Sequence, residues 1–449
     1  MLGKYEDKRY TVKFACLNQL VPEDHLLRKI ESVVDFTEIY DMVECLYCED
    51  NGRPAADPVV LIKMALIQHL YEIKSLRQTV QEVDMNIAYR WFIGYDIDTA
   101  IPHFATLSYA FATRFPSDIF EKIFAWILEA AVAKGFVKAE TVFIDATHIK
   151  ANANRNKKRK ELAKATARVY EARLRKEVNA DRLKHEKKPL KDKEDDDTPA
   201  SSGGKMITKS TTDSECGLFR KGEHKVEFAY TAHVACDEHN FVLAFEVTPG
   251  NVHDSKVFDA IYDRVTKQYP EEIETVAVDA AYKTPWICKK VIDDGRNIAT
   301  AYKRPMSGKG FFRSYEYVYD EYYNCVICPQ NQVLSYATTT RDGYRTFKSD
   351  SAVCRRCPAL QNCTHSRNHQ KIVQKYIWDD YIEIAEDYRH SDRGRETYAK
   401  RGQTIERVFA DAKEKHGMRY TLMKGINRVT NCLKLKFAAM NLKKMAMWA

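Results

Sequence analysis

Two short apolar runs of the chain each lead directly into an aspartate. Residues 142–144 of "ETVFIDATHIK" precede Asp145, and residues 275–278 of "TVAVDAAY" precede Asp279. Short runs of β-branched and aromatic residues predict buried strands, and a carboxylate is costly to bury without a partner. The simplest interpretation is that each aspartate ends its strand and caps the next turn. The alternative is that the two carboxylates share a cation.

The sequence around the two aspartates predicts a mixed α/β fold. The runs "VEFAYTAHVACD" and "FVLAFEVTPG", separated by "EHN", predict a β-hairpin. We expect Asp254 to cap a helix over "SKVFDAIYDRVTKQY", and "NIATAYKRP" predicts a further strand. This order of strands and helices is typical of a mixed sheet with helices packed on it.

A third acidic residue lies on a predicted helix near the C-terminus. In "RGQTIERVFADAKEKHG", apolar residues recur at helical spacing and predict a buried helix face. Glu406 lies beside this face, and Gly417 is expected to end the helix. The face is formed by Ile405, Val408, Phe409 and Ala412. Three carboxylates from two strands and a helix can hold hard divalent cations. Two Mg²⁺ ions about 3.5–4 Å apart catalyse phosphodiester displacement in such sites.

The first 136 residues predict helices. Pro58 stands in the first turn of "DPVVLIKMALIQHLYEI", and Ser75 with Gln78 forms a capping pattern before "VQEV". Several short helices with basic residues between them fit a small DNA-binding bundle. They fit a plain helical domain equally well, so this region alone does not decide between the two.

Charge and hydropathy favour a polyanion as partner and argue against a membrane. The chain has 71 Lys and Arg against 63 Asp and Glu, and the excess of +8 is concentrated in residues 150–177 and after about Arg393. Such clusters suit nucleic acid, although a solvated helix face is the commoner explanation of any single one. The longest apolar stretch, "IFAWILEAAVA", is too short to span a bilayer. The N-terminal "MLGKYEDKRY" has no apolar signal core, so we expect a cytoplasmic protein with reduced thiols.

Two cysteine pairs predict a structural zinc site. Cys325 and Cys328 form "CVIC", and Cys354 and Cys357 open "CRRCPALQNC". Two C-x-x-C pairs at this spacing are typical of a four-thiolate Zn²⁺ site. Unligated thiols are the alternative, and Cys363 or His365 could replace one ligand.

Two other candidate ligand groups are better explained without a metal. "CLYC" (Cys45, Cys48) has no second pair nearby and is interpreted as part of the core. His253, beside Asp254, is interpreted as part of a helix cap.

At the level of motifs, the sequence resembles the DDE transposases of bacterial insertion sequences, which have an RNase H-like catalytic domain. The resemblance rests on "FIDATHIKANAN", "STTDSE", "VTPGNVHDS", "VAVDAAYKT" and "TIERVFADAKEKHGMRY", and on "VPEDHLLRKI" and "GRPAADPVVLIKMALI" in the N-terminal region. It implies that Asp145, Asp279 and Glu406 are the catalytic acids and bind two Mg²⁺ ions, with Mn²⁺ as an alternative. It also implies hydrolysis at transposon ends, followed by attack of the freed 3′-hydroxyl on target DNA.

The resemblance also assigns DNA contacts and partners. The family's C-terminal signature places a Tyr and an Arg before the Glu and a Lys after it, and Tyr398, Arg401 and Lys413 match these positions, although Arg401 stands one residue farther from Glu406 than the family's spacing. Lys415 and Arg419 are further basic residues around this helix. The expected partner is double-stranded DNA, both transposon ends and target, bound by a homodimer near the bacterial nucleoid.

The predicted domains follow from these assignments. Residues 1–136 form a helical DNA-binding domain, and residues 137–310 form the first part of the RNase H-like mixed sheet, with a basic, helix-prone insert at about 150–200. Residues 311–372 form a zinc-ribbon-like insert, and residues 373–449 complete the catalytic core with the Glu helix. The rival interpretation is a catalytically inactive, transposase-derived DNA-binding protein. A simple RNase H-like nuclease would lack the helical region and the cysteine-rich insert.

Overall fold

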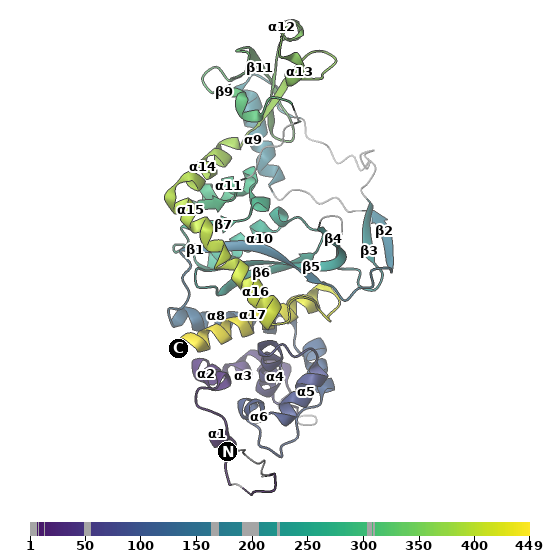
Figure 1. Ribbon diagram of the computed structural model, residues 1–449, viewed down its shortest axis with the longest axis vertical. Coiled ribbons are helices and arrows are strands. Elements are labelled where there is room, and N and C mark those ends of the chain that lie inside the picture. The colour runs from purple at the N-terminus through teal and green to yellow at the C-terminus, as the bar shows by residue number, and fades with distance from the viewer. Residues whose placement is uncertain are drawn as a thin grey trace, which may run out of the picture.

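The computed structural model describes residues 7, 9–12, 14–48, 55–162, 170–190, 206–221, 225–302, 308 and 310–449. These residues form an elongated molecule with a helical region at one end, a mixed sheet in the middle and a small antiparallel sheet at the other end (Figure 1). Parts of the predicted basic insert, at 163–169 and 191–205, lie outside the described residues.

The N-terminal region is all-helical, as predicted. Asp57 accepts hydrogen bonds from the backbone N–H groups at the start of the longest of its early helices, where Pro58 takes the first position. Ser75 accepts the backbone N–H of Gln78 and so caps the next helix. The elements are α1 (Leu17–Leu20), α2 (Leu26–Val33), α3 (Glu38–Val43), η1 (Glu44–Leu46), α4 (Pro58–Leu70), α5 (Leu76–Met85), α6 (Ile87–Ile93), α7 (Phe104–Tyr109), η2 (Ala110–Arg114) and α8 (Ser117–Ala133).

The central sheet has the mixed α/β character that the sequence predicts. Its strand order is β4-β5-β1-β7-β8, and β6 pairs with β5. β1 runs antiparallel to β5 and parallel to β7, and β7 runs parallel to β8. The strands are β1 (Thr141–Lys150), β4 (Gly217–Lys221), β5 (Lys225–Cys236), β6 (Val242–Pro249), β7 (Thr275–Val278) and β8 (Asn297–Thr300).

Helices pack on this sheet and join it to the N-terminal region. The C-terminal helix α17 contacts α8, α4 and α2 as well as β6. The ring of Phe245 lies 4.8 Å from that of Phe437 on α17 and 5.6 Å from that of Phe124 on α8, measured between centroids. One continuous hydrophobic core therefore spans both regions. Outside the two insert regions, the helices after β1 are η3 (Asp254–Lys256), α10 (Phe258–Gln268), η4 (Ala280–Tyr282), α11 (Pro285–Asp293), α14 (Asp379–His390), α15 (Asp392–Ala399), η6 (Lys400–Gly402), α16 (Ile405–Lys415) and α17 (Ile426–Trp448).

The cysteine-rich segment forms a separate antiparallel sheet of order β13-β12-β11-β10-β9. Its own core is small and contains Val326, Leu334 and Phe347. The elements are η5 (Ser314–Glu316), β9 (Val318–Asp320), β10 (Cys325–Ile327), β11 (Val333–Thr339), β12 (Tyr344–Lys348), α12 (Ser351–Arg355), α13 (Leu360–Cys363) and β13 (Ile372–Tyr376). Helix α9 (Glu171–Lys184), from the basic insert, packs against β11.

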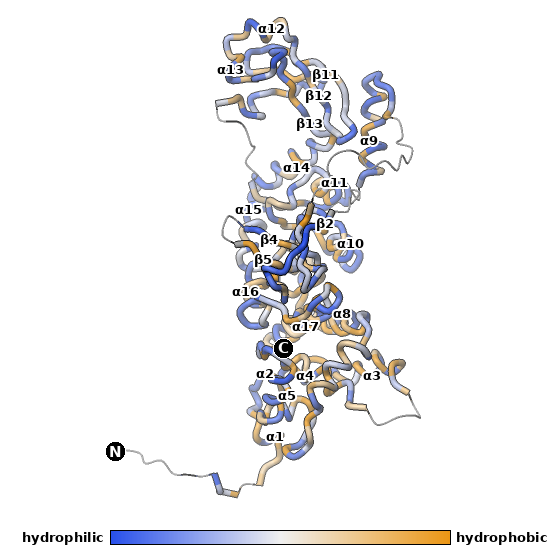
Figure 2. The backbone as a smooth tube through the Cα atoms, turned by 90° about the vertical axis from the view of Figure 1, so that its right-hand side faces the viewer, coloured by the Kyte–Doolittle hydropathy of each residue, from blue (hydrophilic) through white to orange (hydrophobic). Residues whose placement is uncertain are grey.

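Several sequence-based predictions are wrong in detail. The strand that contains Asp145 does not end there, because β1 stays paired with β5 through Lys150. Residues 158–162 were expected to be helical but form strand β2 (Lys158–Leu162), which pairs with β3 (Met206–Ser210). In Figure 2, β2 is strongly hydrophilic, whereas the segment around α8 is largely hydrophobic. The two-stranded ribbon is therefore held by backbone pairing rather than by an apolar face, so hydropathy periodicity did not reveal it.

Two local assignments are also corrected. The side chain of His253, not that of Asp254, accepts the N–H of Ser255 and begins the turn before α10. Cys45 and Cys48 are exposed rather than part of the core, because the short turn after α3 places them at the surface. In the described residues, no helix combines the length and the apolar character needed to cross a membrane.

Candidate active site

Asp145 and Asp279 lie side by side on neighbouring parallel strands. Ile144 of β1 is in register with Val278 of β7, so the two aspartates occupy the next positions, Asp145 within β1 and Asp279 directly after β7. Each carboxylate accepts the backbone N–H of the following residue, at 2.7 Å from Ala146 and 2.6 Å from Ala280. These bonds fix the orientation of both carboxylates.

A buried arginine lies between the two aspartates. Nη2 of Arg401 is 2.5 Å from Oδ2 of Asp145, and Nη1 is 3.7 Å from Oδ1 of Asp279. The same Nη1 donates a hydrogen bond of 3.2 Å to the hydroxyl of Tyr398 on α15. The Arg401 side chain is 5% exposed, and its Nε finds no hydrogen-bond partner among the described residues. A single buried cation thus serves both carboxylates.

The electrostatics of the site are those of crowded, partly desolvated acids. Burial raises the pKa of Asp145 to about 6, although the Arg401 charge acts in the opposite direction. The negative charges of Asp279 and Asp254 raise this pKa further. Burial, followed by the charge of Asp279, also raises the pKa of Asp254. The site therefore favours a cation beyond the one guanidinium that it contains.

Asp254 is a residue of this site that sequence reasoning missed, since it was interpreted as a helix cap. It lies in the turn after β6, and its carboxylate is 3.7 Å from Nδ1 of the fully buried His233 on β5. His233 in turn contacts Thr248 through Nε2, at 2.9 Å. The available signal was weaker, because Asp254 stands five positions after the end of β6 rather than directly after an apolar run.

Glu406 stands at the start of α16, which packs on β1 and β5. The predicted apolar face of this helix is confirmed, since Ile405, Val408, Phe409 and Ala412 are all buried. The side chain of Glu406 is exposed and forms no hydrogen bond or ion pair with the described residues. No three acidic, His or Cys side chains in the described ranges converge closely enough to hold a metal ion. The structure thus brings Asp145 and Asp279 together and leaves Glu406 on the adjacent helix.

The residue chemistry fits divalent cations at the aspartate pair. Both side chains offer carboxylate oxygens, the ligands that Mg²⁺ prefers. The guanidinium of Arg401 already forms an ion pair with Asp145 and, at longer range, with Asp279. The arrangement of the two carboxylates therefore accommodates a positive charge between them.

The predicted DNA-contact residues fall into two groups. Arg401 is buried and contacts the acids directly, whereas Tyr398 is half-buried and reaches them only through its hydrogen bond with Arg401. Lys415 and Arg419 are exposed at the far end of α16, where Lys415 pairs with Asp411 at 2.8 Å and Arg419 pairs with Glu414. Lys413 is half-buried on the same helix. Arg401 and Tyr398 therefore lie at the acidic site, whereas the lysines of α16 and Arg419 lie away from it.

The four cysteines predicted as zinc ligands line two different cavities. Cys328, Cys354 and Cys357 line one small cavity together with Cys363. Cys325 is buried in β10 and lines a different cavity beside His185 of α9. His365 stacks its ring edge-on against Phe311, at 4.7 Å between centroids. The four thiols expected as ligands thus do not share one site.

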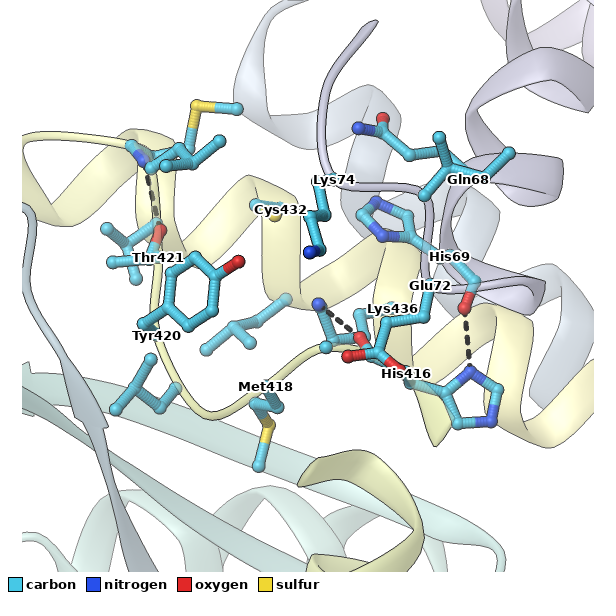
Figure 3. A pocket seen from close by; sticks show the side chains of 17 residues that line it. Gln68, His69, Glu72, Lys74, His416, Met418, Tyr420, Thr421, Cys432 and Lys436 are labelled. Atoms are coloured by element: carbon cyan, nitrogen blue, oxygen red, sulfur yellow. Dashed lines mark hydrogen bonds between the residues drawn. The ribbon is translucent and has the colours of Figure 1, made fainter. Parts of the chain in front are cut away.

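A buried polar joint connects α16 to the N-terminal helices (Figure 3). Nδ1 of His416 bonds to the backbone carbonyl of His69 at 2.8 Å, and Lys436 of α17 donates to the carbonyl of His416. Burial lowers the pKa of His416 to about 4 and that of His69 well below its usual value. Burial also lowers the pKa of Lys436. These groups line a cavity of about 80 Å³ and fix the end of the Glu406 helix to α4.

Comparison with known protein families gives two matches. Residues 15–113 match a transposase domain (DUF772), and residues 327–446 match a transposase DDE domain. The second match contains Glu406, whereas Asp145 and Asp279 lie outside both matched segments. No curated protein matches the chain.

One similar solved structure is described as "Mos1 transposase paired-end complex with left transposon end". It is 10% identical to this chain, and the alignment covers 56% of this chain and 61% of that one, with a TM-score of 0.17. The chain thus spans about three fifths of the solved chain that it matches. A likeness at this TM-score carries no argument about fold or function.

Proposed function

We propose that this chain is a DNA transposase. It binds the inverted-repeat ends of an insertion sequence, cleaves phosphodiester bonds and joins the 3′-hydroxyl ends to target DNA. The matches to a transposase domain and to a transposase DDE domain support this proposal. The observation that carries this proposal is the pairing of Asp145 and Asp279 on adjacent parallel strands around one buried cation. A strand-end cap alone would not explain why two strands present carboxylates to the same guanidinium.

In this proposal Asp145, Asp279 and Glu406 hold two Mg²⁺ ions, with Mn²⁺ as an alternative. Bound there, such ions would activate a water or 3′-hydroxyl and stabilise the leaving oxygen. The backbone N–H groups of Ala146 and Ala280 keep the aspartate oxygens oriented before any substrate arrives. Glu406 would join the pair when DNA binds, because catalytic contacts often tighten only in the substrate complex. The strand order around β1, antiparallel on one side and parallel on the other, supports an RNase H-like core.

The chain's own cations would hold the DNA. Lys413, Lys415 and Arg419 lie on and just after α16, the helix that begins near Glu406. Contacts from such side chains to phosphates set the position of DNA without reading its sequence. Arg401 and Tyr398 would position the acids and the scissile phosphate. The expected partner is double-stranded DNA bound by a homodimer, in the bacterial cytoplasm and at the nucleoid.

A second candidate is a DNA-binding protein that has lost catalysis. The presence of all three acids, two of them oriented at one cation, favours the enzyme. The test is to incubate purified protein with Mg²⁺ and DNA that carries the inverted repeats of its own locus. New 3′-hydroxyl ends and joined products, both absent with Asp279→Asn, support the transposase. Sequence-specific binding without any cleavage in Mg²⁺ or Mn²⁺ supports the second candidate.

A further inference from the structure

Four cysteines surround one small cavity in the insert sheet. Cys328 follows β10, Cys354 lies in α12, Cys357 follows it, and Cys363 ends α13. All four line a cavity of about 20 Å³. A cavity needs about 10–15 Å³ to hold one water molecule. The space therefore accommodates a single small ion and excludes an organic ligand.

The surroundings of these sulfurs suit thiolates. The backbone N–H of Gln332 donates to Sγ of Cys328 at 3.4 Å, in a turn that Asn331 makes possible with a φ of 55°. The hydroxyl of Tyr317 and Sγ of Cys363 share a hydrogen bond of 3.3 Å. Lys371 also lines the cavity, and its ammonium is anchored 3.0 Å from the carbonyl of Cys363. A backbone donor at Cys328 and a cation lining the same cavity are surroundings that favour metal-bound thiolates.

The segment that carries three of the four cysteines has no core of its own. Neither α12 nor α13 buries a residue. The sheet beside them has a core of Val326, Leu334 and Phe347. Small units of this kind commonly gain stability from a disulfide or a metal. The structure joins none of the four cysteines in a disulfide, so a metal is the cross-link that their chemistry still allows for α12 and α13.

We propose that Cys328, Cys354, Cys357 and Cys363 bind one Zn²⁺ as a structural four-thiolate site, and that Cys325 is not a ligand. In the structure the four sulfurs do not yet converge closely enough to hold an ion. Binding draws them together across the cavity to about 2.3 Å from the ion and releases the thiol protons to solvent. Four thiolates leave no open coordination position, so the site has no catalytic role. It tethers α12 and α13 to the turn after β10. This site does not depend on the transposase chemistry proposed above.

The choice between Cys363 and Cys325 gives a matched test. Co²⁺ is titrated into the reduced, metal-free full-length protein and into its Cys363→Ser and Cys325→Ser variants, and the thiolate-to-metal and d–d absorption bands are recorded. The wild type and Cys325→Ser should both bind one Co²⁺ per chain with the spectrum of a four-thiolate site. Cys363→Ser should bind at least tenfold more weakly and lose this spectrum. Absence of stoichiometric binding by the wild type, or loss in Cys325→Ser alone, would overturn the assignment.

A fold defect in Cys363→Ser would also remove the metal, so a second variant separates the two causes. Cys363→His retains a zinc ligand at the same position. It should bind one Co²⁺ with d–d bands shifted towards those of a three-sulfur, one-nitrogen site. A spectrum identical to that of the wild type would show that residue 363 does not touch the metal and would overturn the proposal.

Discussion

The guanidinium of Arg401 lies 2.5 Å from a carboxylate oxygen of Asp145, although 256 positions separate the two residues in the chain. The contact joins the segment before the Glu406 helix to the strand at the centre of the sheet. It also places a positive charge against the largely buried carboxylate of Asp145, whereas the Asp279 side chain is 48% exposed. The same guanidinium therefore stabilises the protein without metal and occupies the region where cations would bind.

The first prediction concerns this arginine. Arg401→Ala should lower the free energy of unfolding by roughly 3 kcal/mol, because removing one partner leaves the largely buried carboxylate of Asp145 unpaired. Mg²⁺ should raise the melting temperature of Arg401→Ala more than that of the wild type, since a metal can replace the lost charge. Arg401→Lys is the matched control and should lose less stability because it retains the positive charge. Equal unfolding free energies for the wild type and Arg401→Ala would contradict this account.

The second prediction concerns pH. The pKa of His416 is lowered to about 4 in the folded protein, against an ordinary value of 6.5. Between these two pH values His416 is therefore protonated in the unfolded chain and neutral in the folded chain. The stability due to neutral His416 is complete above pH 6.5 and is lost as the pH falls towards 4. This histidine alone should contribute a slope of up to about 1.4 kcal/mol per pH unit in that window. Denaturant unfolding of His416→Gln should show a slope smaller by about one proton, and an unchanged slope would show that His416 is not the titrating group.

Hydropathy patterns predicted the apolar strands, the hairpin and the buried face of the Glu406 helix, because these elements bury one recognisable set of side chains. They did not predict that β1 continues past Asp145, since the β5 residues that pair with this extension, Ala229 to His233, lie far away in the sequence. The polar β2–β3 ribbon was missed for a similar reason.

At the candidate site, the sequence indicated Asp145 and Asp279, because each follows an apolar run. It could not show that Arg401 would be buried against them, since the family signature suggested a DNA contact. Nor could spacing alone reveal which cysteines share a cavity, because Cys325 and Cys328 stand three positions apart yet face different sides of the insert sheet.

The third prediction concerns the shared core. Phe437 of α17 is fully buried, and its ring lies against that of Phe245 on β6. Phe437→Ala should lower the free energy of unfolding by about 3–5 kcal/mol through lost burial and the cavity left behind. Phe437→Leu, which keeps most of the volume, is the control and should cost less. A loss below about 1 kcal/mol for Phe437→Ala, measured by denaturant unfolding, would mean that α17 is not packed into a common core.

The fourth prediction concerns DNA binding. Lys415→Ala should weaken binding to transposon-end DNA and reduce the slope of log affinity against log salt by about one phosphate contact. Lys122→Ala is the control, because Lys122 is an exposed lysine on α8 that pairs with Asp118 as Lys415 pairs with Asp411. The control should bind DNA like the wild type. Equal losses in both variants would indicate a general charge effect rather than a contact at α16.

The most direct test of the account is Asp145→Asn, assayed for DNA binding and for cleavage on the same end-containing DNA. The substitution keeps the size of the side chain and removes the charge that would hold Mg²⁺ ions. Cleavage and strand transfer should disappear, while affinity for the DNA stays within about threefold of the wild type, because a lost negative charge near phosphates does not weaken binding. Circular dichroism and the melting temperature provide the check on folding. Cleavage by Asp145→Asn in Mg²⁺ at the wild-type rate would show that this carboxylate is structural and would contradict the proposed catalytic site.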